Sequence, residues 1–183
     1  MEFRQAMTQT LAKMMQEDEK ICILDADLAK PNGTTPLYEQ FPNRCFDVGI
    51  AEANMIGIAA GLSAYGYKPI AFTFAPFATR RVCDQIAVSV AYAKQNVKIV
   101  GTDPGITAEL NGGTHMSFED VAVLRSIPNM IIYDAVDDIQ LSQAIEQIMK
   151  LDTSVYIRMP RKSAQPVFDK NLSLIHISEP TRP

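Results

Sequence analysis

Apolar residues recur along this chain in two different patterns. Residues 2–18 place Phe3, Met7 and Leu11 at the spacing of one helix face, which predicts an amphipathic helix. Other apolar residues come in short unbroken runs without alternation of apolar and polar positions. Such runs are typical of strands that are covered on both faces of a sheet. Because the two patterns alternate along the chain, we expect helices packed on both faces of a mostly parallel sheet.

The predicted elements follow one another without an internal repeat or a low-complexity segment. The predicted strands are 21–24, 45–48, 69–74, 97–101, 130–133 and 154–157. The predicted helices are 2–18, 51–65, 78–94, 118–126 and 137–150, with a polar loop over 29–35. The fold class that follows is α/β, a three-layer α/β/α sandwich with a mostly parallel sheet. In such sheets ligands bind outside the carboxyl ends of the strands, so we expect the chemistry in the loops that follow them.

The helix predicted over 51–65 is apolar on almost every side. A helix of this kind is either buried on all sides or lies at an interface. Gly57 and Gly61 would let a neighbouring helix approach closely, and Gly66 is a natural place for the helix to end.

The composition is that of an ordinary globular domain. With 183 residues, 47% hydrophobic and 21% charged, the chain is long enough to bury a core and suits one domain. The net charge of −4 and the pI near 5.2 exclude the basic surface that binds nucleic acid or an anionic membrane. No apolar run is long enough to span a bilayer, and the charged N-terminal segment is unlike a signal peptide.

The cysteines exclude two kinds of site. Cys22, Cys45 and Cys83 lie far apart with no CxxC motif, so they form neither a zinc site nor a disulfide framework. Reduced thiols are typical of a cytoplasmic protein. We therefore expect a cytoplasmic chain that supplies no metal ligands of its own.

The C-terminal segment reads as foreign to the rest of the chain. Its letters LSLIHISEPTR translate the sequence of a transposase adapter used in library preparation, so we expect residues 172–183 to be an artefact and the native protein to be cut near Asn171. This removes His176 from any site and leaves His115 as the remaining histidine.

Glu52 is the most informative polar position. It lies where the predicted strand 45–48 leads into the apolar helix, and a carboxylate in the first turn is favoured by the helix dipole. A glutamate there can simply cap the helix. The helix has almost no polar face, however, and a buried acid requires a partner.

Two further features follow strands. Phe74 and Phe77 lie at a strand end and a helix start, where they either pack in the core or stack on a flat ligand. The Gly-rich loop 103–115 ends in His115 directly after a Gly-Gly-Thr sequence, where the backbone can come close to a ligand.

The segment DVGIAEANMIGIAAGLSAYGYKP resembles the part of transketolases that holds the glutamate facing thiamine diphosphate. The resemblance implies that Glu52 is catalytic and hydrogen-bonds a ring nitrogen of the cofactor's aminopyrimidine. This bond makes the exocyclic amine more acidic, and the imine that forms when the amine loses a proton can take the proton from the thiazolium carbon. It also implies that Phe77 packs against the pyrimidine ring, with Phe74 beside it, and that Asp27 lies near the cofactor and the dimer contact.

The resemblance also implies a set of substrate-binding residues. His115 matches the family histidine that reaches substrate, and we count it as catalytic as well. Arg158 and Arg4 match arginines that bind the phosphate of the sugar, for which a planar guanidinium is well suited. Asn32 and Thr34 lie in a loop expected to face the substrate phosphate.

The chain departs from the family pattern at two positions near the sugar. Many transketolases have a histidine where this chain has Asp103, and an acid where it has Asn111. We keep both residues as substrate-binding candidates. The departures leave the preference for sugar donor and acceptor open.

The likeness extends from Glu2 to Arg161 and is greatest to short, split transketolases. It implies a pyrimidine-binding domain over 1–165, with 166–171 beginning a linker to a C-terminal domain beyond this sequence. The chain lacks the Gly-Asp-Gly…Asn signature that holds magnesium and the diphosphate. We therefore expect Mg²⁺ and the diphosphate to be held by an N-terminal, diphosphate-binding transketolase subunit, in a homodimer or heterotetramer that transfers a two-carbon ketol unit between phosphosugars.

Two alternatives remain open at the level of the sequence. The first is another enzyme of the same superfamily, either deoxyxylulose-phosphate synthase or the β component of a 2-oxoacid dehydrogenase. The second is a non-catalytic binding or structural domain in which Glu52 only caps its helix. Burial of Glu52 discriminates between a cofactor role and the second alternative, because an exposed carboxylate could not serve the cofactor.

Overall fold

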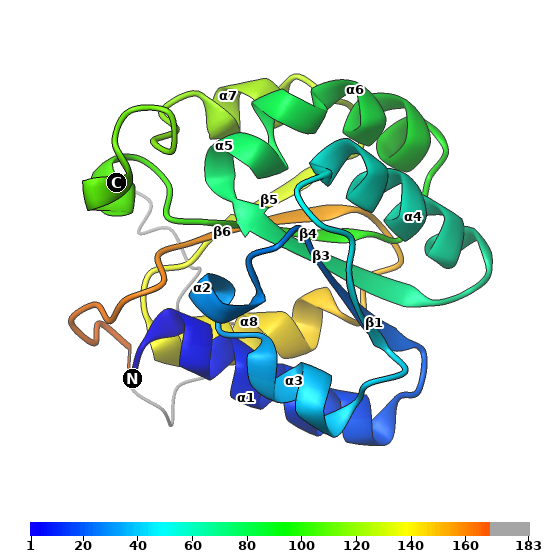
Figure 1. Cartoon of the computed structure of the whole chain (residues 1–183), viewed down its shortest axis with the longest axis horizontal. Helices are drawn as coiled ribbons and strands as arrows, with labels where there is room; N and C mark the ends of the chain where they lie inside the picture. Colours follow the sequence, from blue (N-terminus) through cyan, green and yellow to red (C-terminus); the bar gives the residue numbers. More distant parts are fainter. Residues whose placement is uncertain (169–183) are drawn as a thin grey trace, which may run out of the picture.

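Parallel strands form the centre of the computed structural model, which describes residues 1–168 (Figure 1). The strands are β1 (Ile21–Asp25), β2 (Cys45–Asp47), β3 (Lys68–Phe74), β4 (Lys98–Thr102), β5 (Ile131–Asp134) and β6 (Val155–Met159). They form one sheet in the order β2-β1-β3-β4-β6-β5, and every neighbouring pair is parallel. The predicted α/β fold is confirmed. The expectation of an artefact at 172–183 lies outside the described residues.

Helices cover both faces of the sheet. They are α1 (Phe3–Glu17), α2 (Ala29–Asn32), α3 (Thr35–Gln40), α4 (Glu52–Ala64), α5 (Ala75–Ala78), η1 (Arg80–Val82), α6 (Cys83–Gln85), η2 (Ile86–Tyr92), η3 (Ile106–Asn111), α7 (Asp120–Arg125) and α8 (Asp138–Ile148). Figure 1 shows α1, α3 and α8 below the sheet, and α4 to α7 above it. Within residues 1–168, no helix combines the length and the apolar character that a membrane crossing requires.

The polypeptide differs from the predicted elements in two places. We expected a polar loop over residues 29–35, but residues 29–40 contain the two short helices α2 and α3. Pro36 lies in the first turn of α3, where its missing N–H is tolerated. The helix predicted over 78–94 is divided into four pieces. The backbone of Thr79 is not helical (φ −129°, ψ −86°), so α5 ends there, and η2 is a π-helix. Arg80 and Arg81 lie on η1, directly after this break.

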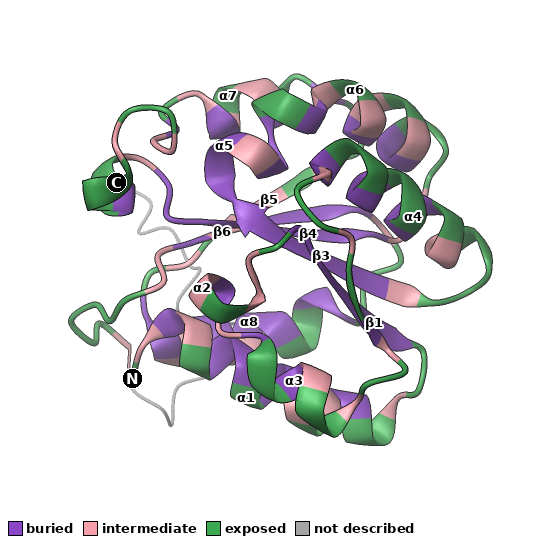
Figure 2. Ribbon diagram, in the orientation of Figure 1, coloured by how far each residue is buried: buried purple, intermediate pink, exposed green. Residues whose placement is uncertain are grey.

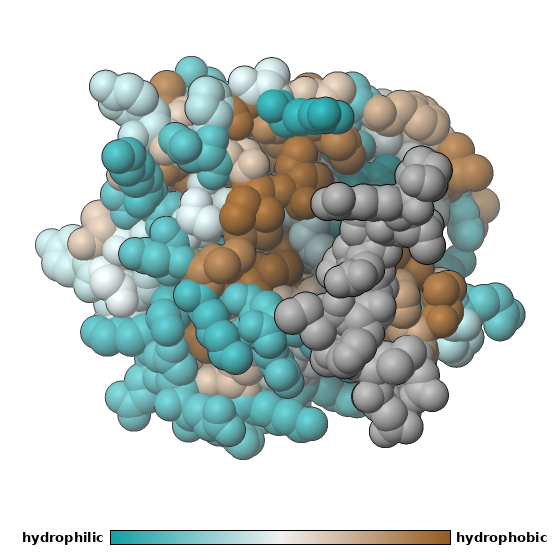
Figure 3. All heavy atoms as spheres, turned by 180° about the vertical axis from the view of Figure 1, so that it is seen from behind, coloured by the Kyte–Doolittle hydropathy of each residue, from teal (hydrophilic) through white to brown (hydrophobic). Residues whose placement is uncertain are grey.

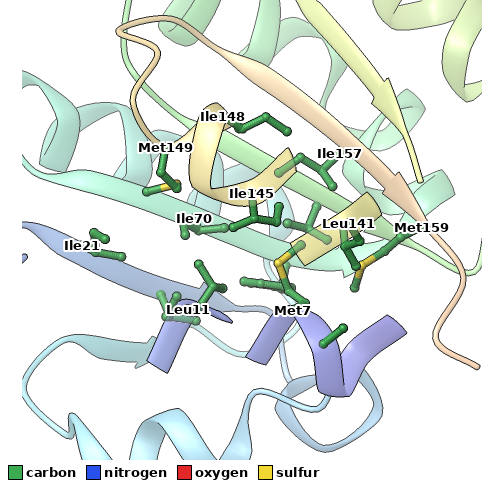
Figure 4. Packing of buried hydrophobic residues seen from close by; sticks show 14 of the residues in the cluster. Met7, Leu11, Ile21, Ile70, Leu141, Ile145, Ile148, Met149, Ile157 and Met159 are labelled. Atoms are coloured by element: carbon green, nitrogen blue, oxygen red, sulfur yellow. The ribbon is translucent and has the colours of Figure 1, made fainter. Parts of the chain in front are cut away.

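Two apolar cores, one on each face, hold the layers together. Below the sheet, Met7 and Leu11 of α1 pack with Leu141 and Ile145 of α8 (Figure 4). Above it, α4, α5, η1, η2 and α7 contribute buried residues to a second cluster. Figure 2 shows that β1, β3, β4 and β6 are buried along most of their length. This burial explains why the strands read as unbroken apolar runs.

The edges of the molecule are less fully covered. Strand β5 lies at one end of the sheet, and its first residue, Ile131, is exposed. Figure 3, which views the molecule from behind, shows apolar residues gathered near the middle of that face, with hydrophilic residues below and to the left of them.

Helix α4 buries Met55 and Ala59 against the sheet but exposes Gly57 and Ile58. Of the two expectations for this helix, burial on all sides is therefore wrong for the chain by itself.

A buried carboxylate joins β1 to the segment that follows it. Asp25 accepts hydrogen bonds from Asn32 Nδ2 (3.0 Å), Thr34 Oγ1 (2.7 Å) and Tyr38 Oη (3.3 Å). Asn32 Oδ1 in turn accepts from Thr102 Oγ1 of β4 at 2.9 Å. Burial raises the pKa of Asp25 to about 6, although the three hydrogen bonds act to lower it. The network fixes α2 and α3 against the sheet.

The raised pKa of Asp25 predicts a specific pH dependence of stability. Because the folded pKa of about 6 lies above the ordinary 3.8, the stability linked to its proton is present below about pH 4 and lost as the pH rises through 6. Asp25→Asn removes this component. Between pH 4 and pH 7 the free energy of unfolding of the wild type should therefore fall, relative to that of the variant, by on the order of 2–3 kcal/mol. Urea unfolding of both proteins across this range measures the difference. A difference that stays constant with pH contradicts the assignment.

Candidate active site

A cavity of about 290 Å³ lies at the carboxyl ends of β1 and β3, beside the start of α4. Its lining residues are Ala26, Asp27, Leu28, Ile50, Glu52, Phe74, Phe77, Arg81 and His115. It opens at the edge of the sheet where ligands of parallel α/β folds bind. The cofactor-facing residues expected from the sequence, Asp27, Glu52, Phe74 and Phe77, line this one cavity, together with His115.

The carboxylate of Glu52 is directed into the cavity from the first residue of α4. Its residue is 4% exposed, and Oε1 accepts a hydrogen bond from Arg81 Nη1 at 2.7 Å. The turn before the helix depends on Gly49, which has φ +71° and donates its N–H to Asp47 Oδ1 at 2.9 Å. The same oxygen accepts from Asp27 N at 3.0 Å. The side chain of Asp47 thus joins the loop that contains Asp27 to the turn at Gly49 that precedes Glu52.

Aromatic rings form one wall of the cavity. The ring centres of Phe74 and Phe77 are 6.1 Å apart, and the ring of His115 lies edge-on to both, at 5.6 Å and 5.1 Å. Phe74 ends β3 and is buried, whereas Phe77 is half-buried in α5. Such a wall offers dispersion and offset stacking to a flat ligand.

The loop that carries His115 is braced from the side by Arg80. Arg80 Nη1 donates to Glu119 Oε1 at 2.8 Å, and Nη2 approaches the carbonyl oxygen of Thr114 at 3.3 Å. Thr114 Oγ1 lies 2.9 Å from His115 Nδ1. The half-buried imidazole therefore has one ring nitrogen engaged with its neighbour.

A second cation, Arg161, lies next to the aromatic wall. Its guanidinium carbon is 5.0 Å from the centre of the Phe74 ring, and its nitrogens form an ion pair with Asp103. Asp103 is buried after β4, with φ +53°, and also accepts from the backbone N–H of Arg161 at 3.2 Å. The sequence analysis named Asp103 but missed Arg161. The signal was present, because Arg161 follows the end of β6 at the same edge of the sheet.

Arg158 is engaged elsewhere. Its Nε donates to Asp120 Oδ2 at 2.8 Å and its Nη1 to Asp134 Oδ2 at 2.9 Å. The Asp120 carboxylate is buried and also accepts from Tyr156 Oη at 3.0 Å. The neighbouring carboxylates hold the pKa of Arg158 above its ordinary value. Arg158 thus links β6 to β5 and α7, outside the cavity lining.

The remaining substrate candidates do not reach this cavity. Arg4 pairs with Glu2 at 2.7 Å and lines a separate cavity of about 550 Å³ between α1 and α2. Asn32 and Thr34 are buried, and their side chains are hydrogen-bonded within the Asp25 network; their contact with substrate stays a prediction. Asn111 is exposed at the end of η3.

Arg81 is the other residue that the sequence analysis missed. It follows the Phe74–Phe77 pair by four positions, in a segment predicted as one continuous helix. The backbone is not helical at Thr79, and Arg81 lies on the short helix η1 that follows, where its side chain bonds Glu52. A break of this kind leaves no pattern of apolar residues from which it could be predicted.

Comparison with known proteins identifies the family. The model of the transketolase pyrimidine-binding domain matches residues 1–166. A 6-deoxy-6-sulfo-D-fructose transketolase subunit, SqwH, from Clostridium sp. (strain MSTE9) is 52% identical over 168 residues, which are 92% of this chain and 52% of that protein. A 1-deoxy-D-xylulose-5-phosphate synthase from Symbiobacterium thermophilum is 35% identical over 86% of this chain and 24% of its own length.

A solved structure agrees with these relatives. A split gene transketolase, described as an inactive beta4 tetramer, superimposes with a TM-score of 0.83 at 38% identity, over 94% of this chain and 56% of that one. This chain therefore spans only about half the length of the split transketolase subunits that it matches. The cavity, the sheet and the matches lead to one conclusion: the chain belongs to the transketolase family and contains its pyrimidine-binding domain.

Proposed function

We propose that this chain is the pyrimidine-binding part of a thiamine-diphosphate-dependent transketolase, which transfers a two-carbon ketol unit between phosphosugars. The observation that carries the proposal is the buried carboxylate of Glu52 beside the aromatic wall. An aminopyrimidine needs the same two features, an acid at one ring edge and an apolar surface against one ring face. The cavity residues therefore fit the group that the family implies.

Thiamine diphosphate, when bound, supplies a thiazolium carbon that carries the two-carbon unit. In this proposal Glu52 in its acid form donates its proton to a ring nitrogen of the pyrimidine and holds the ring in register. Phe77 and Phe74 exclude water from the ring face, which strengthens that hydrogen bond. His115, at the mouth of the aromatic wall, is suited to exchange a proton with a sugar hydroxyl.

The acidic head group of the sugar requires a cation near the cavity. Arg161 is better placed for this role than Arg158, because its guanidinium lies over Phe74 and has one carboxylate partner, Asp103, whereas that of Arg158 is held by two carboxylates. Arg4 lies at the other cavity, and Asn111 at an exposed loop end, so both remain candidates for a more distant part of a substrate. The Clostridium relative is named for a sulfosugar. A sugar that carries a sulfonate in place of the phosphate is therefore the alternative substrate to test.

The proposed enzyme needs a second polypeptide. The Clostridium relative is named a subunit, and this sequence lacks the Gly-Asp-Gly…Asn signature for magnesium and diphosphate. We therefore assign Mg²⁺ and the diphosphate to a diphosphate-binding transketolase subunit, in a homodimer or a heterotetramer. The exposed face of α4, with Gly57, Ile58 and Gly61, suits contact with another subunit. The unpaired Cys22, Cys45 and Cys83 suit the reducing cytoplasm.

A different enzyme of the superfamily is the main alternative. The Symbiobacterium relative is a deoxyxylulose-phosphate synthase and shares the pyrimidine domain at 35% identity. The Glu52 chemistry is the same in both cases, so assays of ketol transfer and of deoxyxylulose-phosphate formation separate them. The β component of a 2-oxoacid dehydrogenase and a purely structural domain are less well supported, the latter because Glu52 is buried in the cavity wall.

Replacing the proposed cofactor acid should abolish most of the activity without unfolding the chain. Glu52→Gln keeps the size of the side chain but cannot donate a carboxylic proton, so turnover should fall by about 10²–10⁴-fold. The measurement is ketol transfer by the chain combined with its diphosphate-binding subunit. Glu39→Gln on the exposed face of α3 is the matched control and should retain full activity. Turnover of Glu52→Gln within a few-fold of the wild type contradicts the proposal.

Substitutions of Arg158, in β6, and of Arg161, which follows β6, should have different kinetic effects. Arg161→Gln should raise the KM for a phosphorylated sugar by about tenfold and change kcat little, because a charge-assisted contact is lost. Arg158→Gln should leave KM unchanged. Both variants should lower stability by about 3 kcal/mol, since the buried Asp103 and Asp120 each lose a cationic partner. Steady-state kinetics and urea unfolding of both variants test this. The reverse pattern would return the phosphate-binding role to Arg158.

A further inference from the structure

The guanidinium of Arg81 fills the space between Glu52 and Phe77. Its Nη1 is 2.7 Å from Glu52 Oε1, and its Cζ is 3.7 Å from the centre of the Phe77 ring. The side chain of Arg81 is 44% exposed, whereas that of Glu52 is 4% exposed. The cation thus reaches in from the mouth of the cavity and covers the carboxylate.

A guanidinium and an aminopyrimidine place similar demands on this site. Both are flat, both carry nitrogens along an edge, and both stack on aromatic faces. Arg81 makes an edge contact to Glu52 and a face contact to Phe77 at the same time. These are the two contacts that the proposed function assigns to the pyrimidine ring. In this structure Arg81 therefore occupies Glu52 Oε1 and a face of the Phe77 ring.

We propose that Arg81 is an internal occupant of the pyrimidine site, which a flat heterocyclic ligand must displace in order to bind. The inference rests on the proposed function for the identity of that ligand. The exchange replaces the guanidinium of Arg81 with a ring edge of the ligand as the hydrogen-bonding partner of Glu52.

The two neighbouring arginines are held in different ways. Arg80 is tied to Glu119 and to the carbonyl of Thr114. Arg81, by contrast, contacts the cavity residues Glu52 and Phe77. Arg81 lies on the short helix η1 with almost half of its side chain in solvent, so it can swing outward without disturbing the core.

The ion pair between Arg81 and Glu52 also contributes to the stability of the fold. Glu52 is almost fully buried, and a buried carboxylate without a partner destabilises the fold. Arg81 provides that partner until a ligand takes over. The consequence is competition, because each ligand molecule that enters must first break the ion pair.

The test is binding of the pyrimidine part of the cofactor to the full chain. The probe is 4-amino-5-hydroxymethyl-2-methylpyrimidine, which needs no diphosphate-binding subunit, and its dissociation constant is measured by NMR titration. Arg81→Ala should bind the probe about two- to fivefold more tightly than the wild type, the factor expected for loss of a half-exposed ion pair. Arg81→Lys should lie between the two, since an ammonium keeps the charge but not the flat surface. Arg125→Ala, an exposed arginine on α7, is the matched control and should bind as the wild type does.

Each outcome of the titration has a distinct meaning. Equal binding by the wild type and Arg81→Ala, or weaker binding by Arg81→Ala, overturns the proposal but leaves the pyrimidine site intact. Binding by none of the proteins overturns both this proposal and the proposed function. Circular dichroism and thermal melting show whether each variant is folded. Arg81→Gln provides a second neutral variant and should bind the probe as tightly as Arg81→Ala.

Discussion

The architecture of the site depends on one constraint, a carboxylate buried at the open edge of a parallel sheet. Glu52 is 4% exposed at the first turn of α4, and a charge in that position destabilises the fold unless another group pairs with it. The helix start and its dipole favour the negative charge, and Gly49 turns the chain so that the carboxylate enters the cavity. The aromatic wall and Arg81 are arranged around it. A group that replaces Arg81 must offer Glu52 an equally good partner.

Other buried acids lie near the same edge of the sheet. Their hydrogen-bonding and ionic partners differ from the partner of Glu52. Asp25 is held by an amide and two hydroxyls, Asp103 by Arg161, and Asp120 by Arg158 and a tyrosine. These contacts join strands to the loops that follow them and fix the positions of the loops. The partner of Glu52, by contrast, comes from the solvent side of the cavity. The site thus combines acids whose partners are fixed by the surrounding elements with one acid, Glu52, whose partner is a half-exposed side chain.

The sequence carries most of the fold and part of the site. Strands are predictable because burial on both faces requires unbroken apolar runs, and Glu52, Phe74, Phe77 and His115 are predictable from the segments that resemble transketolases. The break at Thr79 is not, since it arises from backbone angles rather than from a pattern of residue types. The surroundings of Asn32 could not be predicted either, because its amide oxygen is bonded to Thr102, 70 residues away in the sequence. The choice between Arg158 and Arg161 likewise depends on which carboxylates lie nearby.

The central claim is that this chain provides half of a thiamine-diphosphate site. The most direct measurement is calorimetric titration of thiamine diphosphate with magnesium into the chain, with and without the diphosphate-binding subunit from the same genome. The account predicts tight binding only when both polypeptides are present, because the pyrimidine contacts come from this chain and the contacts to magnesium and the diphosphate come from the other. No binding to the combined polypeptides, or equally tight binding to this chain by itself, would contradict it.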